Sequence, residues 1–391
     1  MEFINVKLSD IGEVVGGSTP STKNPDNYDG NIAWITPKDL AGYNKVYISK
    51  GERNITEMGF KSCSTKILPK NSVLFSSRAP IGYVAISKND LCTNQGFKSI
   101  IPNDKIDYKF LYYLLKYNKD YIASKGSGST FKEVSGSVMK GIELSIPKNI
   151  NDQKKISKVL FDIDKKIELN NEINNNLHEL CNNLYFKLVS QLNDTNSSVE
   201  SIKNVAKCVL GGTPSRTKKE YWNGSINWIN SGEINKFRII KASEKITELG
   251  LNKSSTTLLP RGTTVLAITG ATLGQVSRLE IDSCANQSVI GIITNEKELN
   301  NYMYLSILNS INDLVLKQTG GAQQHINKND VETHEIIVPS MELISQFDEI
   351  IRPLFDQISV NCFEINKLSE LRDKLLPKLM NGEIDLDNIE I

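Results

Sequence analysis

An internal duplication is the feature that most constrains how this chain can fold. Residues 14–35, VVGGSTPSTKNPDNYDGNIAWI, return as VLGGTPSRTKKEYWNGSINWI at 209–229. Further matches are separated by nearly the same number of residues. Trp34 and Trp228 are 194 residues apart. A separation of 192 residues relates Asn94-Gln95 to Asn286-Gln287, Cys92 to Cys284 and Pro147 to Pro339. Because chance does not keep one offset over so many matches, the chain contains two copies of one unit.

Each copy begins with a segment of about 145 residues that predicts a compact α+β domain. Short β-like runs at 32–35, 72–75 and 83–86 are separated by Gly, Pro, Asn and Ser, which favour turns. A helical pattern follows at 110–116, and then a glycine-rich turn at 126–131.

The remainder of each copy predicts one long helix. After Pro147 and again after Pro339, apolar residues recur at alternating steps of four and three, and equivalent positions lie 191 residues apart. Such seams are typical of helices that pack against another helix, and a polar seam residue commonly fixes the register. Pro353 predicts a kink or a fresh helix start. The expected packing residues are Ile156, Leu160, Ile163, Ile167, Asn170, Leu177, Leu184, Ile351, Leu354, Ile358, Asn361, Ile365, Leu368 and Leu375.

The charge distribution separates the two kinds of segment. The net charge is only +1, which by itself argues against a nucleic-acid partner. Residues 1–148 hold 20 basic and 14 acidic side chains, and residues 196–339 hold 15 and 13. The helical segment 149–195 holds 6 basic and 7 acidic side chains, and the helical segment 340–391 holds 5 basic and 11 acidic ones. The globular segments are therefore positive and the helices negative, as expected if the former meet DNA and the latter meet protein.

The whole chain resembles the specificity subunits of type I restriction-modification systems. The resemblance lies in the order of domains and helices, in the openings GGSTPS and GGTPSR followed by NIAWI and INWI, and in the ending LLPKLMNGEIDL. It implies target-recognition domains at 1–148 and 196–339, with spacer helices at 149–195 and 340–391 that pack as an antiparallel coiled coil. Each domain would read one half of a split, asymmetric DNA sequence. The segment from Ile156 to Leu188 would be roughly 50 Å of helix, long enough to place two domains about one DNA turn apart.

The resemblance also implies partners and excludes chemistry. The helices would dock two methyltransferase subunits, which bind S-adenosylmethionine and methylate adenine, and two restriction subunits may join them. The chain itself is expected to be non-catalytic, without cofactor or metal. Six scattered cysteines, no apolar run of 18 residues and no signal sequence predict a cytoplasmic protein that does not enter a membrane.

Candidate DNA contacts are hydroxyl, amide and basic side chains in turns, since these suit phosphates and base edges. Ordinary solvated turns, a surface salt bridge at Arg78 and a flexible connection at 320–326 are the competing interpretations. The candidates are Thr19, Ser21, Thr22, Lys23, Ser77, Arg78, Ser129, Thr130, Thr213, Ser215, Arg216, Lys218, Lys219, Thr269, Gln323 and Gln324.

Other conspicuous residues have structural interpretations. Trp34 and Trp228 are expected in the core rather than stacked on bases. The Gly-Gly pairs at 16–17 and 211–212 are expected to allow a tight backbone path. The three histidines lack partners at ligand spacing, and Cys92 and Cys284 are expected to pack as small apolar groups.

Two rival functions follow from the same sequence. A methyltransferase with its own recognition domains would need an Asn/Asp-Pro-Pro-aromatic motif and a glycine-rich cofactor loop, and Asn24-Pro25-Asp26 lacks the second proline. There is also no GxxxxGK[ST] loop for nucleotide hydrolysis. An assembly protein that displays tandem domains on a coiled coil is the second rival, and the weak net charge is its best support.

Overall fold

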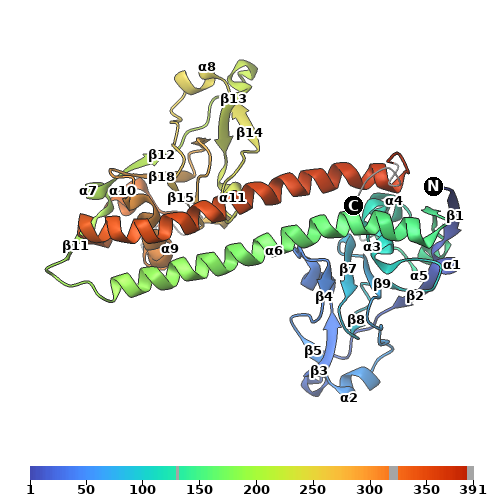
Figure 1. Ribbon diagram of the computed structural model, residues 1–391. Helices are drawn as coiled ribbons and strands as arrows, with labels where there is room; N and C mark the ends of the chain where they lie inside the picture. The colour runs from blue at the N-terminus through green and yellow to red at the C-terminus, as the bar shows by residue number, and fades with distance from the viewer. Residues whose placement is uncertain (129–131, 317–324, 385–391) are drawn as a thin grey trace. The chain divides into compact units, whose positions relative to one another are not determined.

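The computed structural model describes residues 1–128, 132–316 and 325–384 and divides into two compact units. Unit 1 comprises Met1–Leu169 and Asn366–Ile391, and unit 2 comprises Asn170–Ile365. Each unit holds one copy of the duplicated α+β domain together with a segment of each long helix, α6 (Ile150–Val189) and α11 (Met341–Met380) (Figure 1). The predicted fold class is confirmed.

The described residues of unit 1 form three sheets. The largest has the order β2-β9-β6-β7-β4 and is antiparallel except for the edge strand β4, and the second, β5-β3-β8, pairs β3 with β8 in parallel. The third joins β1 and β10. The strands are β1 (Phe3–Lys7), β2 (Gly12–Gly16), β3 (Tyr28–Ile35), β4 (Tyr47–Ile48), β5 (Asn54–Ile55), β6 (Val73–Ser77), β7 (Ile81–Ser87), β8 (Cys92–Thr93), β9 (Lys98–Pro102) and β10 (Glu143–Pro147). The helices before α6 are α1 (Leu8–Ile11), α2 (Glu57–Lys61), α3 (Tyr108–Tyr117), α4 (Lys119–Ser124) and α5 (Gly136–Gly141).

Unit 2 repeats this topology strand for strand. The orders β12-β18-β15-β16, β14-β13-β17 and β11-β19 match those of unit 1, and a single parallel bridge between Ile239 and Leu279 takes the place of β4. The strands are β11 (Ser197–Ser201), β12 (Ala206–Leu210), β13 (Trp222–Ile229), β14 (Glu244–Ile246), β15 (Thr264–Ala267), β16 (Val276–Arg278), β17 (Cys284–Ala285), β18 (Val289–Thr294) and β19 (Glu335–Pro339). The helices before α11 are α7 (Ile202–Val205), α8 (Glu248–Asn252), α9 (Leu299–Leu316) and α10 (Lys328–Glu332).

The main core of each unit lies between the largest sheet, one amphipathic helix and both long helices. In unit 1, buried side chains of α3 such as Phe110 and Leu114 share one cluster with Ile156 and Leu160 of α6 and Leu379 of α11. In unit 2, α9 takes the place of α3, and its Tyr302 joins Cys181, Ile351 and Phe355 in the equivalent cluster. The long helices therefore complete the domain cores.

Smaller cores surround the two matched tryptophans. Trp34 packs with Tyr28, Ile55 and the buried Cys92. Trp228 packs with Ile246 and the buried Cys284 in the same way. All six cysteines are unpaired, and the expectation that both tryptophans are core residues is confirmed.

The structure places the predicted seam residues on the inward faces of α6 and α11. Ile156, Leu160, Ile167, Asn170, Ile351, Ile358 and Asn361 are buried, while Ile163, Leu177, Leu184, Leu354, Ile365, Leu368 and Leu375 are partly buried. The buried face also includes polar residues that the apolar pattern missed, namely Gln153, Ser157, Asp164, Asp348 and Ser359. α11 continues as one helix through Pro353, so the fresh helix start is wrong.

In unit 2 the two helices meet through polar side chains. Asn361 donates from Nδ2 to Oδ1 of Asn174 over 2.9 Å, and Asn170 donates to Glu364 over 2.7 Å. The residue number of the partner on α11 decreases from 364 to 361 as the residue number on α6 increases from 170 to 174, so the helices run antiparallel there. Side-chain amides at such positions satisfy one another only in one register, so this pairing selects the observed register.

In unit 1 a charged pair takes the equivalent role. Nη1 of Arg372 on α11 donates to Oδ1 of Asp164 on α6 over 2.7 Å, and the hydroxyl of Tyr113 on α3 donates to the other carboxylate oxygen over 2.8 Å. Asp164 is buried and Arg372 is largely so. One carboxylate therefore links three helices of this unit.

A partly buried histidine of α6 faces the domain of unit 2. His178 packs edge to face on Phe237, with ring centroids 5.2 Å apart, and Asn182 lies 3.2 Å from its Nε2. Burial, reinforced by the charge of Arg238, lowers the pKa of His178 from 6.5 to about 4. His178 is therefore neutral in the folded protein at pH 7.

No helix within 1–128, 132–316 and 325–384 is long and apolar enough to cross a membrane.

We expect Arg372→Met to lower the free energy of unfolding by about 2–4 kcal/mol, because it leaves the buried Asp164 carboxylate without its cation. The double variant Asp164→Asn/Arg372→Met keeps an acceptor for Tyr113 and removes the stranded charge, so it should be less destabilised than Arg372→Met. Urea denaturation of wild type, Arg372→Met, Asp164→Asn and the double variant measures the coupling. Additive losses would contradict an energetically coupled pair.

We also expect His178 to make stability depend on pH. Its folded pKa of about 4 lies below the 6.5 of the unfolded chain, so between these values the unfolded state binds the proton. The free energy of unfolding contributed by this group is therefore complete above pH 6.5 and declines as the pH falls toward 4. Thermal melts of wild type and His178→Gln between pH 7 and 5 should show a smaller pH slope for the variant. Equal slopes would refute this assignment.

Candidate nucleic-acid interface

The turn at residues 16–20, which we call the glycine-threonine turn of unit 1, follows β2 and passes over the end of β8. The N–H of Ser18 donates to the carbonyl of Thr93 over 3.0 Å, and the indole N–H of Trp34 donates to the carbonyl of Ser18 over 3.1 Å. A Cβ added at Gly17 would lie 2.1 Å from the Thr93 carbonyl oxygen. Glycine is therefore required at position 17 for the backbone to approach the strand this closely.

Unit 2 builds its glycine-threonine turn, residues 210–214, in the same way. The N–H of Gly212 donates to the carbonyl of Ala285 over 2.8 Å, and the indole of Trp228 donates to the carbonyl of Gly212 over 3.0 Å. A Cβ at Gly211 would lie 2.1 Å from the Asn286 carbonyl oxygen. The expectation of a tight backbone path at the glycine pairs is confirmed for Gly17 and Gly211.

Each turn holds one exposed glutamine. The hydroxyl of Thr19 donates to Oε1 of Gln95, and the hydroxyl of Thr213 donates to Oε1 of Gln287. Both glutamines are exposed, while both threonines are partly buried. The side-chain carbonyl of each glutamine is therefore fixed to the turn.

The remaining predicted residues of these turns lie at the surface. Ser21, Thr22 and Lys23 are exposed in unit 1, and Ser215, Arg216, Lys218 and Lys219 are exposed in unit 2. Their exposure allows contact with a large ligand such as DNA, although two of the cations already have partners within the chain.

Arg216 is the most constrained of these cations. Its guanidinium donates to both carboxylate oxygens of Glu244 over 2.6 and 2.8 Å, and it stacks 3.7 Å from the Trp222 ring centroid. The bond from Arg216 lowers the pKa of Glu244. Arg216, Trp222 and Lys245 border a groove of about 580 Å³, so this guanidinium presents a fixed face to that groove. Lys218 makes a single hydrogen bond of this kind, from its Nζ to the Tyr221 hydroxyl over 3.1 Å.

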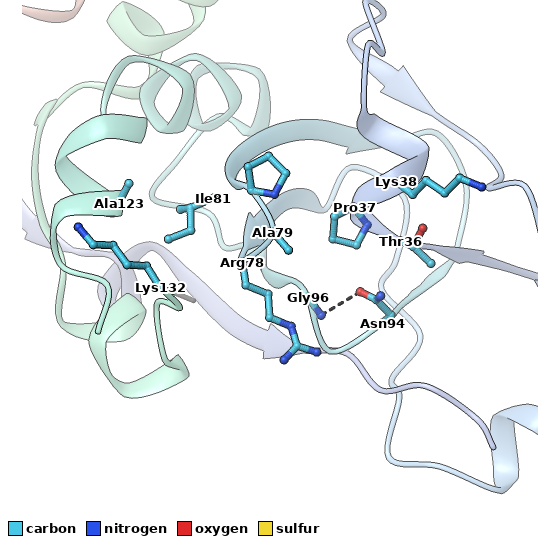
Figure 2. A pocket seen from close by; sticks show the side chains of 11 residues that line it. Thr36, Pro37, Lys38, Arg78, Ala79, Ile81, Asn94, Gly96, Ala123 and Lys132 are labelled. Carbon is cyan, nitrogen blue, oxygen red and sulfur yellow. Dashed lines mark hydrogen bonds between the residues drawn. The ribbon is translucent and has the colours of Figure 1, made fainter. Parts of the chain in front are cut away.

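Unit 1 has a larger groove, of about 840 Å³, with cations at its rim (Figure 2). Lys132 lies beside Ala123 at one end, and Lys38 lies beside Thr36 at the other. Arg78 also lines the groove and pairs with Glu133 at 3.5 Å, where Lys98 lies 3.3 Å from the same carboxylate. The rest of the lining is formed by Pro37, Ala79, Pro80, Ile81, Asn94 and Gly96. The groove thus combines apolar walls with basic ends, which suits a nucleic acid.

Ser77 and its counterpart in unit 2, Thr269, are both at least partly buried. Ser77 is fully buried, and both its N–H and its hydroxyl donate to the carbonyl of Gly96, over 2.7 and 3.2 Å. The prediction that Ser77 contacts DNA is therefore wrong, because its side chain has no exposed surface. Thr269 in unit 2 is partly buried and forms a β-bridge with the exposed His325. Ser129, Thr130, Gln323 and Gln324 lie outside the described residues.

Sequence reasoning missed Lys38 and Lys132 as groove residues. Lys38 follows Pro37 in a short helical turn and Lys132 follows a glycine-rich stretch, so only folding brings their charges to one groove. The sequence could have identified Gln95 as a candidate residue, since Asn94-Gln95 recurs as Asn286-Gln287. Among the described residues, no group of three His, Cys, Asp or Glu side chains could hold a metal ion.

We expect Gly17→Ala to destabilise unit 1 by more than about 2 kcal/mol, because the added methyl group would collide with the Thr93 carbonyl. Gly16→Ala is the matched control, since its Cβ would meet only the flexible Lys98 side chain at 3.9 Å and unit 2 has Leu210 at this place. Thermal denaturation should shift for Gly17→Ala and stay near wild type for Gly16→Ala. Equal melting temperatures for the two variants would contradict the close approach.

The chain is similar to known proteins over nearly its whole length. The family described as type I restriction modification DNA specificity domain matches residues 2–179 and 195–371. The type I restriction enzyme MjaIX specificity subunit of Methanocaldococcus jannaschii is 34% identical over 407 aligned residues, covering 98% of this chain and 94% of that protein. The HindI specificity subunit of Haemophilus influenzae is 25% identical and covers 89% of each chain.

A solved structure supports the same fold. The type I restriction-modification S subunit from M. genitalium superposes with a TM-score of 0.65 at 16% identity, over 97% of this chain and 96% of that one. The two family matches coincide with the two copies of the duplicated domain, each with the helix that follows it. The chain therefore belongs to the family of type I restriction-modification DNA specificity subunits.

Proposed function

We propose that this specificity subunit reads a bipartite, asymmetric DNA target, one half with each of its two domains. The observation that carries the proposal is one scaffold built twice with different surface side chains. Unit 1 has Arg78 and Lys38 where the duplicated sequence of unit 2 has Gly270 and Gly232. Because the side chains that reach bases decide sequence preference, two such surfaces favour two different half-sites.

Charge supports DNA as the ligand. Three basic side chains of unit 1, Arg78, Lys38 and Lys132, line its groove. In unit 2, the Arg216 guanidinium is held flat against Trp222 by Glu244, so it can meet a phosphate or a guanine edge without further ordering. The small net charge of the chain is compatible with this, since the two globular segments are net positive and the helical segments are net negative.

The same proposal makes the chain the non-catalytic part of a larger complex. Its two long helices would dock adenine methyltransferase subunits, and those subunits would bind S-adenosylmethionine. The docking surface that we propose is the water-facing side of the helix segments in unit 2, where the exposed apolar side chains include Leu180 and Phe186 of α6 and Ile350 and Val360 of α11. Two methyltransferase subunits, and two restriction subunits where the system cleaves DNA, complete the proposed assembly in the cytoplasm.

Methylome sequencing tests the function directly. A host that carries this gene with its neighbouring methyltransferase should contain an N6-methyladenine motif split by a fixed gap, and deletion of this gene alone should abolish it. Arg78→Ala should relax or change only one half of the motif, since Arg78 has no counterpart in unit 2. Unchanged methylation after the deletion, with the methyltransferase still expressed, would reject the recognition role and favour an assembly protein.

A further inference from the structure

The Thr-Gln pair is preserved in both domains although the residues around it differ. Thr19 holds Gln95 in unit 1, and Thr213 holds Gln287 in unit 2. Close by in the chain, the turn continues with Thr22-Lys23 in one domain and Arg216-Thr217 in the other. A surface that reads two different sequences is expected to vary, so a preserved exposed side chain calls for a role that both half-sites share.

The support beneath each glutamine is also duplicated. Asn94 Oδ1 accepts the N–H of Gly96 over 2.8 Å, and Asn286 Oδ1 accepts the N–H of Ser288 over 3.1 Å. The N–H groups of the same two asparagines donate to Ile35 and Ile229 over 2.9 and 3.0 Å. Each glutamine therefore belongs to a backbone turn that hydrogen bonds hold in place. Most of the conformational entropy of its side chain is lost before a ligand binds.

The fixed orientation selects the chemistry that the glutamine offers. The threonine hydroxyl donates to Oε1 and so orients the side chain, and the Nε2 amide group on its other branch can only donate to a ligand. In unit 1 the residues on either side of Gln95, Asn94 and Gly96, line the basic groove. A ligand in that groove therefore passes next to this donor.

We propose that Gln95 and Gln287 donate to backbone phosphates, one in each half-site, and thereby set the register of each domain on DNA without reading sequence. This assignment rests on the proposed DNA-reading function. Phosphate is favoured over a base edge because it is the acceptor that every half-site presents, whereas a base-specific donor would force the two halves to share a base. Variable residues such as Arg78 would then supply the sequence preference.

The test uses Gln→Ala and Gln→Glu variants at each position in the complete complex of this chain with its methyltransferase. Binding is measured by fluorescence anisotropy at several salt concentrations, with a duplex that carries the methylated motif and with a duplex of shuffled sequence. Gln95→Ala should weaken binding to both duplexes by a similar factor of about 3–10, with the salt slope unchanged because no charge is removed. Gln287→Ala should behave alike, and neither variant should change the motif found by methylome sequencing.

Gln95→Glu separates DNA contact from a structural role. Glutamate keeps an oxygen for the Thr19 hydroxyl but sets a negative charge against the phosphate, so it should bind at least about fivefold more weakly than Gln95→Ala. If Gln95 served only to hold the turn, Gln95→Glu would bind like wild type, and the inference would be overturned. Thr19→Ser and Thr19→Val complete the series, since the serine keeps the hydroxyl that orients the amide and should bind more tightly than the valine.

The controls keep this inference apart from the proposed function. Arg78→Ala removes a cation and should lower the salt slope by about one phosphate if that cation meets the backbone, or change one half of the motif if it meets a base. Loss of binding in Arg78→Ala with wild-type binding in the glutamine variants would reject only the phosphate contacts. A changed half-motif in Gln95→Ala would show base reading and reject the phosphate assignment. If the wild-type complex bound neither duplex, the DNA-reading function itself would be rejected.

Discussion

The two long helices complete the hydrophobic cores of the domains, and the rest of the structure depends on this constraint. In unit 1, Ile156 and Leu160 of α6 and Leu379 of α11 belong to the same buried cluster as the α3 helix. In unit 2, Cys181 of α6 and Ile351 of α11 do the same with α9. Neither domain can bury the apolar face of its sheet and helix without these segments, so each helix is fixed to a domain by the burial of apolar area rather than by a flexible linker.

Polar side chains then select one arrangement among the many that apolar packing allows. Asp164 accepts from both Arg372 and Tyr113, and Asn174 pairs with Asn361. A shift of either helix would leave these buried groups without partners, which costs more than the loss of an apolar contact. Such specificity matters for a protein whose proposed task depends on holding recognition surfaces in fixed positions.

The domains themselves divide into a constant scaffold and a variable surface. The tryptophan-supported glycine-threonine turn is the same in both, down to the close approach of Gly17 and Gly211 to a neighbouring carbonyl. The side chains that border the grooves differ, as Arg78 and Gly270 illustrate. Duplication followed by change at the surface allows two half-sites to be read by one kind of fold, because the buried framework tolerates little change while exposed positions tolerate much.

The sequence by itself determined the duplication, the two long helices and the core positions of Trp34 and Trp228, because each leaves a periodic or repeated pattern along the chain. It could not reveal Asp164 or Gln153 as buried, since both lie off the apolar seam. Gln153 bonds to the domain, whereas Asp164 bonds both to Arg372 of α11 and to Tyr113 of α3. Ser77 was misassigned because a hydroxyl beside an exposed arginine has no sequence signature of burial.

Only the tertiary structure decided which cations share a groove. Lys38, Arg78 and Lys132 are far apart in the chain and line one groove, because the short turn after β3, the end of β6 and the segment before α5 converge there. Likewise, the repeat showed that Asn94-Gln95 mattered, but only the fold showed that Thr19 orients Gln95. Repetition and periodicity are properties of the chain alone, whereas the direction of a side chain is set by contacts between segments distant in sequence.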